Sequence, residues 1–523
     1  MRKTYTVMAV GILMLSTGCN SFLDVNTNPN GPQSVSANLY LAPMLHWMVT
    51  SPQLDGRFVG HYAQEWISTT TNFSPPQSWG KMGYDAGSDN GGQQWRDVYW
   101  SLGQNLIDMN NKAQAEQRWD LLGVGMILKA WGWQVLTDLH GEIIIKEAID
   151  QTRTQFDYDT QQYAYEEVQR LLDSAIVLLK HTDGAVDQAY LAVGDKIYNG
   201  DRAKWLKLAA GMLALNLNHY TNKVSSYDPA RVIRLVDSSF ADNSDDALLP
   251  YPCTSTDFAD CNFWGPTRAN IPLYRQTQFV VGLMDGTQFG GTVDPRISRM
   301  LAIDSANATY RGLDINAVTT LAPFGALQTT QPLRPRNFFG YVGSGGLGLP
   351  SRYIFADRNK LPVMTYAELQ FIKAEAALRS GNPVASTAYR NGISAHFQFV
   401  NDRNSEAGNP ASITTTTRDS FLASPNIVPV TLTLSHIMSQ KYIALWGWGH
   451  NELWMDMRRY HYADTVFRGF APPNPRFTDN IGEVVQRIRP RFNSEYVWNR
   501  DALDVIHGLD GTYHTRELWI TQP

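Results

Sequence analysis

The chain has 523 residues, of which 43% are hydrophobic and 18% are charged, and its formal net charge is -5 at pH 7. A globular chain with this balance has no basic field to attract a phosphate backbone, so we exclude nucleic acid as a partner. After the first 18 residues no apolar stretch reaches the roughly 20 residues that span a bilayer. The nearest one, 121–136, is interrupted by Lys129.

The first 18 residues have the pattern of a secretory signal peptide. A charged start, Met1–Lys3, precedes the apolar segment Val7–Leu15, and small residues then lead to Cys19. A cysteine at this place resembles the lipobox of bacterial lipoproteins, in which cleavage precedes the cysteine and acyl chains such as palmitate are added. Two or more such chains anchor a protein stably. Ser16 stands where a lipobox usually has Leu, and a plain secretory peptide with an incidental cysteine is the alternative.

The remaining chain is predicted to be a tether followed by one mostly α-helical domain. Residues 19–38 are rich in Asn, Pro and Gly and lack periodicity, which indicates an extended tether. In the domain, residues 39–523, apolar spacing of three and four predicts helices over 95–115, 119–137, 163–180, 201–220, 365–380, 384–400 and 435–460. Asp201 is a candidate N-cap, and Thr365 with Glu368 forms a capping-box pattern in a helix that Gly381 is placed to end. These helices mostly come in pairs, which favours a stack of tetratricopeptide-like helix pairs.

Four long insertions rich in turn-forming residues interrupt the helices, near 68–93, 240–360, 401–432 and 465–523. Loops of this length are usually functional or disordered. Their many aromatic residues argue against disorder, so we expect them to be folded over the helices. Cys253 and Cys261 lie in one of them and either form a disulfide or stay as two thiols. No spacing matches a metal site, and no cofactor is expected.

Short blocks recur in one order along nearly the whole chain. They are Cys19–Asp24, Thr137–Glu142 with Lys146–Ala148, Ile197–Trp205, Asp294–Arg296, Tyr366–Ala376, Gln440–Leu445 and Asp456–Arg459. Each is common by itself, but their joint order resembles the SusD/RagB family of outer-membrane nutrient-binding lipoproteins. One departure is Ile144, which stands where the family has proline.

The resemblance implies a helical scaffold with the insertions assembled over it as a ligand-binding face. It also implies that the protein is lipid-anchored to the outer membrane, and we expect it to face the cell surface. There it would deliver an oligosaccharide to a SusC-like TonB-dependent barrel. On this interpretation the protein is not an enzyme. Most residues of the matched blocks are expected to be structural.

A carbohydrate site needs flat rings for the apolar C–H faces of a sugar and polar groups for its hydroxyls. The aromatic insertions supply both. The stacking candidates are Trp79, Tyr84, Trp264, Phe338 and Tyr341. The polar candidates are Arg268, Asn270 and Asn337. For each ring the competing interpretation is that it anchors its own loop.

Two other functions stay open, namely capture of a peptide or other nutrient by the same mechanism, and glycoside hydrolysis. Candidate acids for hydrolysis are Asp85, Asp89, Asp257 and Asp260. Residues 343–348 match GxGxxG, but Pro350 follows where a dinucleotide site needs a helix. His450–Glu452 resembles a catalytic group, yet its place in a matched block favours a packed helical corner.

Overall fold

The computed structural model describes residues 35–68, 75–254, 258–317, 334–340, 352–409 and 411–523. Its longer helices are α2 (Leu41–Tyr62), α5 (Gly103–Ala115), α6 (Trp119–His140), α7 (Gln161–Leu178), α9 (Arg202–Asn218), α10 (Pro229–Asp237), α14 (Tyr366–Arg379), α15 (Val384–Glu406), α16 (Thr415–Ala423), α17 (Leu434–Leu445) and α18 (His450–Arg459). The shorter ones are α3 (Pro75–Gly80), α4 (Gln93–Arg96), α8 (Gln188–Gly194), α11 (Gln278–Met284), α12 (Ile297–Met300) and α19 (Arg500–Val505).

Short helical turns and two small sheets complete the described chain. The turns are η1 (Ala37–Tyr40), η2 (Asp97–Leu102), η3 (His219–Asn222), η4 (Asn243–Asp245), η5 (Phe258–Asp260), η6 (Ile315–Ala317), η8 (Thr478–Asn480), η9 (Phe492–Tyr496), η10 (Tyr513–Thr515) and η11 (Trp519–Thr521). Strand β1 (Trp66–Ser68) pairs antiparallel with β3 (Tyr274–Gln276), so that Trp66 lies opposite Gln276. Strand β2 (Ala247–Leu249) pairs in the same way with β4 (Leu361–Met364).

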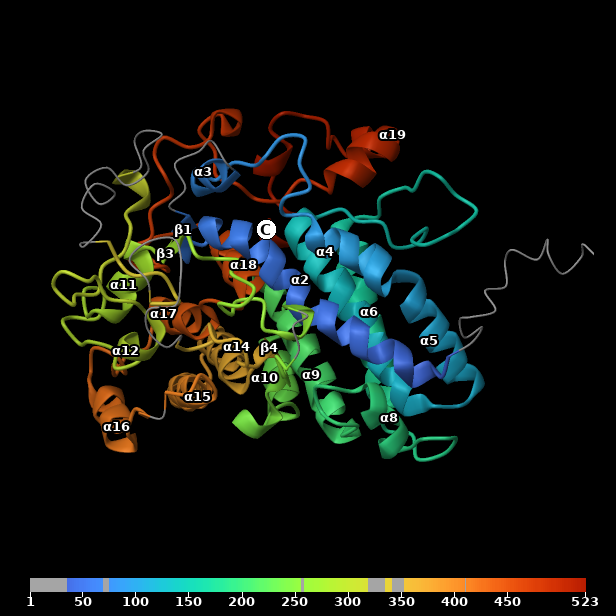
Figure 1. The fold of residues 1–523 in the computed structure, drawn as a ribbon, viewed down its shortest axis with the longest axis horizontal. Helices are drawn as coiled ribbons and strands as arrows, with labels where there is room; N and C mark the ends of the chain where they lie inside the picture. The colour runs from blue at the N-terminus through green and yellow to red at the C-terminus, as the bar shows by residue number, and fades with distance from the viewer. Residues whose placement is uncertain (1–34, 69–74, 255–257, 318–333, 341–351, 410) are drawn as a thin grey trace, which may run out of the picture.

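The helices pack as a continuous stack of neighbouring pairs. Helix α6 lies between α5 and α7, α9 packs on α7 and α10, and α14 contacts α10, α15 and α17. Figure 1 shows α2 running across this stack, and its contacts join α18 near the C-terminus to α3 and α4 near the N-terminus. The mostly α-helical, tetratricopeptide-like scaffold that the sequence predicts is therefore confirmed.

Local signals fix several helix ends as predicted. The Asp201 carboxylate accepts hydrogen bonds from the backbone N–H groups of Ala203 and Lys204 at the start of α9. Thr365 and Glu368 form the reciprocal capping box of α14. Gly381 follows that helix with φ +67°, a left-handed conformation that glycine adopts without steric cost.

Other boundaries differ from the prediction because long-range contacts set them. The predicted helix 435–460 is two helices, and the turn between them holds Gly447, whose N–H donates to the Glu65 carboxylate at 2.7 Å. Helices α2 and α16 were not predicted, and α16 lies in an insertion expected to be irregular. Ala37 and Asn38, placed in the predicted tether, are buried in the domain.

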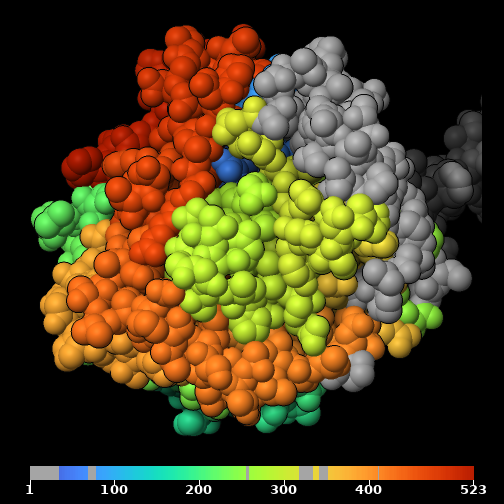
Figure 2. Space-filling model, turned by 90° about the vertical axis from the view of Figure 1, so that its left-hand side faces the viewer, coloured from blue at the N-terminus to red at the C-terminus, as the bar shows by residue number. Residues whose placement is uncertain are grey.

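The insertions cover one side of the stack. Figure 2 shows this face, where residues of the 270–317 region form the centre and residues of the 385–475 region border them below and on the left. Within the described ranges, no helix has both the length and the apolar character needed to cross a membrane. The insertions are therefore the part of the described molecule in which to look for a site.

Candidate functional site

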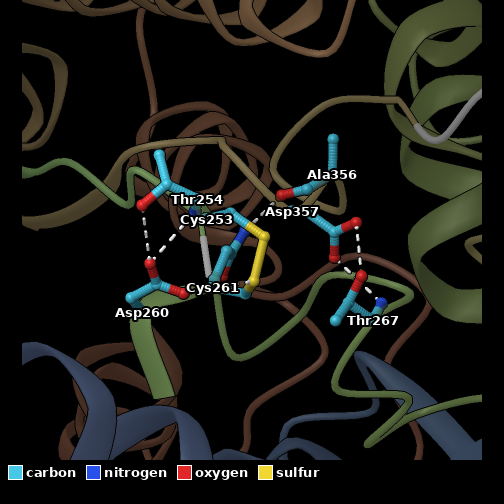
Figure 3. Close-up of a disulfide and its surroundings, with 8 residues drawn as sticks. Cys253, Thr254, Asp260, Cys261, Thr267, Ala356 and Asp357 are labelled. Carbon is cyan, nitrogen blue, oxygen red and sulfur yellow. Dashed lines mark hydrogen bonds between the residues drawn. A yellow bond between two sulfur atoms is a disulfide. The ribbon is translucent and has the colours of Figure 1, made fainter. Parts of the chain in front are cut away.

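Residues 253–270, here called the pinned loop, connect β2 to β3 and are described except for 255–257. Figure 3 shows that Cys253 and Cys261 are bonded, which settles the alternative left open by the sequence in favour of a disulfide. The Asp260 carboxylate accepts hydrogen bonds from the N–H of Thr254 at 3.0 Å and from its hydroxyl at 3.2 Å. The first half of the loop is thus closed by a covalent bond and by polar contacts.

The second half of the pinned loop is held by the segment before β4. Thr267 donates from its backbone N–H and its hydroxyl to the two carboxylate oxygens of Asp357, at 2.9 and 2.8 Å (Figure 3). The Asn262 side chain donates to the carbonyl of Ile354 at 2.7 Å. The described second half of the loop is therefore held in place by the protein's own contacts.

Two of the predicted stacking rings, Trp264 of this loop and Phe338, are buried beneath its surface. Trp264 is 0% exposed, its indole N–H donates to the Gln53 side-chain oxygen at 2.6 Å, and its ring packs 5.3 Å from that of Trp66. Phe338 is buried and stacks on Phe355 with ring centroids 4.5 Å apart. The expectation that these rings offer exposed faces is wrong, because both support the loop from inside the core.

Two of the predicted polar residues, Asn337 and Asn270, also have their side chains bound to the protein's own backbone. Asn337 is buried, and its side chain donates to the carbonyl of Pro272 at 3.0 Å and accepts from the N–H of Phe339. Asn270 is half-buried and donates to the carbonyl of Phe263 at 2.9 Å. These contacts hold the backbone of the site, so any part these amides take in binding stays a prediction.

The outer surface of the pinned loop carries cations and one exposed ring. The guanidinium groups of Arg57, from α2, and of Arg268 lie 5.6 and 5.3 Å from the centre of the Phe263 ring, and both arginines are partly exposed. Burial lowers the pKa of nearby His46, and the charge of Arg268 lowers it further. Phe258, between the two cysteines, is 60% exposed. Phe258 is not among the residues that the sequence predicts for the site, although it lies between the two cysteines in a polar segment.

Trp79 and Tyr84 lie together at a separate hollow of about 170 Å³. Trp79 is buried and packs against Phe58, whereas Tyr84 is half-buried and donates to the Asp479 carboxylate at 2.7 Å. Burial, together with this hydrogen bond, raises the pKa of Tyr84 to about 12. Arg57 links the two regions, since its guanidinium also lies 5.5 Å from the Phe58 ring. Tyr341, Asp257 and the GxGxxG segment 343–348 lie outside the described residues.

The described residues form neither an open metal site nor a catalytic group at His450. The one group there with metal-ligand spacing is Cys253, Asp260 and Cys261, and its sulfurs are already bonded to each other. His450 is buried, with its ring nitrogens 2.6 Å from the Glu65 carboxylate and 3.1 Å from the Gln53 oxygen. The expectation of a packed helical corner at His450 is thus confirmed.

Comparison with known proteins identifies the fold family. A SusD-like family model, described as "Starch-binding associating with outer membrane", matches residues 29–488. The chain belongs to this family. No curated protein matches the chain.

Solved structures agree with this SusD-like assignment at the level of the fold. A SusD/RagB family protein from Bacteroides thetaiotaomicron has a TM-score of 0.71 at 19% identity, covering 93% of this chain and 99% of that one. A SusD homologue from Bacteroides fragilis has a TM-score of 0.72 at 18% identity, covering 93% and 100%. A SusD homologue from Flavobacterium johnsoniae, described as chitin-binding, has a TM-score of 0.71 at 17% identity, covering 93% and 98%.

Proposed function

We propose that this SusD-like chain is a lipid-anchored carbohydrate-binding protein of the outer membrane. It captures an oligosaccharide at the pinned loop and passes it, unaltered, to a SusC-like TonB-dependent barrel. The family description as starch-binding and the chitin-binding neighbour support carbohydrate as the ligand class. Anchoring through Cys19, exposure at the cell surface and the barrel partner are parts of the proposal that follow from the sequence resemblance.

The observation that carries the proposal is the outer surface of the pinned loop. Phe258 offers an exposed flat ring, and the partly exposed guanidinium groups of Arg57 and Arg268 lie against the Phe263 ring of the same loop. A ring can cover the apolar face of a sugar, and guanidinium N–H groups can donate to its hydroxyls. Because the disulfide and the Asp357 contacts fix the loop, binding loses little conformational entropy.

The described candidate acids favour binding over hydrolysis. Asp85 accepts a hydrogen bond from Asn90, Asp89 forms an ion pair with Arg491, and Asp260 accepts from Thr254. Each carboxylate is thus occupied in holding its own loop, whereas a glycosidase needs two that flank the scissile bond. Release of new reducing ends from polysaccharide by the purified protein would support hydrolysis instead.

The binding test uses calorimetry with chitohexaose and maltoheptaose as probes. The double variant Phe258→Ala, Arg268→Ala should weaken binding at least tenfold, because it removes both the ring and a donor. Val430→Ala is the control, since Val430 is fully exposed in another insertion. Unchanged affinity in the double variant contradicts the placement. Binding of an unstructured peptide mixture in preference to both sugars favours the peptide-capture alternative.

The anchor is tested by fractionation. Cys19→Ala should move the protein from the membrane fraction to the soluble fraction, because acyl chains are its expected hold on the bilayer. Retention of the variant through a high-salt wash contradicts lipid anchoring. Affinity purification of the wild type from its own membranes should bring down a TonB-dependent barrel, and its absence contradicts the partner.

A further inference from the structure

A larger hollow is lined by residues of α4, η2 and η9, where the start of the helix stack meets the C-terminal segment. Figure 1 shows the place of α4 in the stack. Its volume is about 520 Å³, within the range of about 300–1,000 Å³ that small-ligand sites occupy. The side chains that matter for its chemistry are Trp95, Tyr99, Trp100, Phe156, Arg491 and Glu495. Neither the sequence motifs nor the pinned loop account for this hollow, here called the aromatic cleft.

The rings of the aromatic cleft include one that faces solvent. Trp100 is 76% exposed, whereas Trp95 is buried and Tyr99 is partly buried. The Tyr99 hydroxyl donates to the carbonyl of Ile144 at 2.8 Å and accepts from the N–H of the same residue at 3.0 Å, which fixes this wall of the cleft. A large exposed indole beside ordered rings gives the cleft a flat apolar face.

The base of the cleft is rigid. The buried Glu495 carboxylate accepts hydrogen bonds from the Trp95 indole at 3.2 Å, the Tyr158 hydroxyl at 2.5 Å and the Asn499 amide at 3.0 Å. Asn499 also exchanges two hydrogen bonds with the backbone of Phe156, each 2.9 Å long. The walls are therefore set in the free protein, which lowers the entropic cost of binding.

Two unusual backbone turns position Trp100 and Glu495. Trp100 stands on η2 and Glu495 on η9, and both elements are π-helical turns. Such turns are rare and frequently occur at functional sites, because the wider turn redirects side chains that a regular helix would place elsewhere. Two of them facing one cleft are a second, independent sign that this region is built for a ligand.

Charged donors line the rim of the cleft. Arg96 is exposed, and Arg491 is partly exposed and paired with Asp89. Arg491 also borders the smaller hollow at Tyr84, where the guanidinium of Arg489 lies 4.4 Å from the Tyr84 ring centre. The two hollows thus share one arginine.

We propose that the aromatic cleft is a second carbohydrate subsite, in which a neutral sugar ring stacks on Trp100 and takes hydrogen bonds from Arg96 and Arg491. The inference rests on the proposed function for the ligand class. A sugar fits the combination of an exposed indole, ordered walls and donors at the rim. A protein partner fits less well, because these groups are gathered in one hollow, whereas a stable protein interface spreads over about 800 Å² on each side.

Calorimetry on the full chain with chitohexaose and maltoheptaose tests the second subsite. The wild type should bind two equivalents of at least one probe, and Trp100→Ala should weaken one of them at least tenfold, because the stacking face is removed. Trp498→Ala is the matched control, since Trp498 is 74% exposed but does not line the cleft. Trp100→Phe should restore part of the lost affinity.

The outcomes separate this inference from the proposed function. One equivalent that is lost in Phe258→Ala, Arg268→Ala and unchanged in Trp100→Ala overturns the second subsite and leaves the first in place. One equivalent that depends on Trp100 alone supports the cleft and contradicts the pinned-loop site. No binding of either probe by the folded wild type overturns both for neutral sugars. An effect of Trp498→Ala equal to that of Trp100→Ala also overturns the cleft assignment.

Discussion

The helix stack and the pinned loop use charged residues in opposite ways. Inside the stack, the fully buried Lys441 ammonium lies 2.6 Å from the Glu452 carboxylate and 2.8 Å from that of Asp456. At the pinned loop, Arg268 and Arg57 of α2 lie against the Phe263 ring and stay partly exposed. Charges enclosed by helices pair with one another and stabilise the fold, whereas charges at the surface of the pinned loop can still contact a ligand. Stability and binding should therefore respond to different substitutions.

The largest expected effect is on stability, from Lys441→Met. Burial opposes the charge of Lys441, but Asp456 and Glu452 raise the pKa of the amine above its ordinary value, so the charged pair is the folded form. Removing one partner of a buried ion pair costs about 3–5 kcal/mol. Denaturant titration followed by circular dichroism should show that loss, while sugar affinity of the folded variant stays the same.

The control for this substitution is Arg170→Met, because Arg170 is 62% exposed and pairs with Glu167 on the surface of α7. Exposed pairs contribute about 0–1 kcal/mol. If both variants lost the same free energy of unfolding, the buried ion pairs would stabilise the fold no more than an exposed pair does.

A smaller, pH-dependent effect is expected at His219, which is buried in contact with the Glu452 carboxylate at 2.8 Å. Burial alone lowers the pKa of His219, but Glu452 and Asp138 outweigh it and raise the pKa to about 9. An unfolded histidine titrates near pH 6.5. Protonated His219 therefore stabilises the fold fully below about pH 6.5, and this contribution is lost as the pH rises through about 9.

The difference between the two pKa values corresponds to about 3 kcal/mol. The difference in the free energy of unfolding between wild type and His219→Gln should accordingly decrease by about that amount from pH 6 to pH 10. This range covers roughly the titration of His219 in both the unfolded and the folded state. Denaturant titrations at a series of pH values measure this difference. A difference that stays constant contradicts a charged His219.

A further, smaller loss of stability is expected from Cys253→Ser, Cys261→Ser, and this double variant should also affect ligand binding. Chain-entropy estimates for a loop of this length give about 2–3 kcal/mol of lost stability. Reordering the loop on binding should also lower sugar affinity by about 2- to 10-fold. Calorimetry measures the sugar affinity of this variant and of Lys441→Met. If only Lys441→Met lost affinity, the result would contradict the assignment of binding to the pinned loop and of stability to the buried charges.

The helical scaffold was largely predictable because its signals are local. Caps at Asp201 and Thr365 depend on residues within one turn, and the spacing of apolar residues marks the helices themselves. One error came from a contact that no local window contains. The predicted helix 435–460 is broken at Gly447, whose N–H donates to Glu65, 382 residues away.

The candidate site was less predictable, because exposure is a property of the assembled fold. Trp264 looked like a binding residue in sequence, but its partner Gln53 is 211 residues away and draws the indole into the core. Phe258 and Trp100 are exposed, although nothing in their composition separates them from buried rings nearby. The π-helical turn that carries Trp100 lies inside a region predicted as one regular helix, 95–115.

The Gln53 side-chain oxygen joins three segments that are remote in the chain. It accepts from Trp264 and lies 3.1 Å from a ring nitrogen of His450, 397 residues after it. The support under the binding face is thus complete only when almost the entire polypeptide has been synthesised. Contacts of this range slow folding and couple distant parts of a protein. Truncated versions ending before residue 450 are accordingly unsuitable stand-ins for ligand studies, however well their helices form.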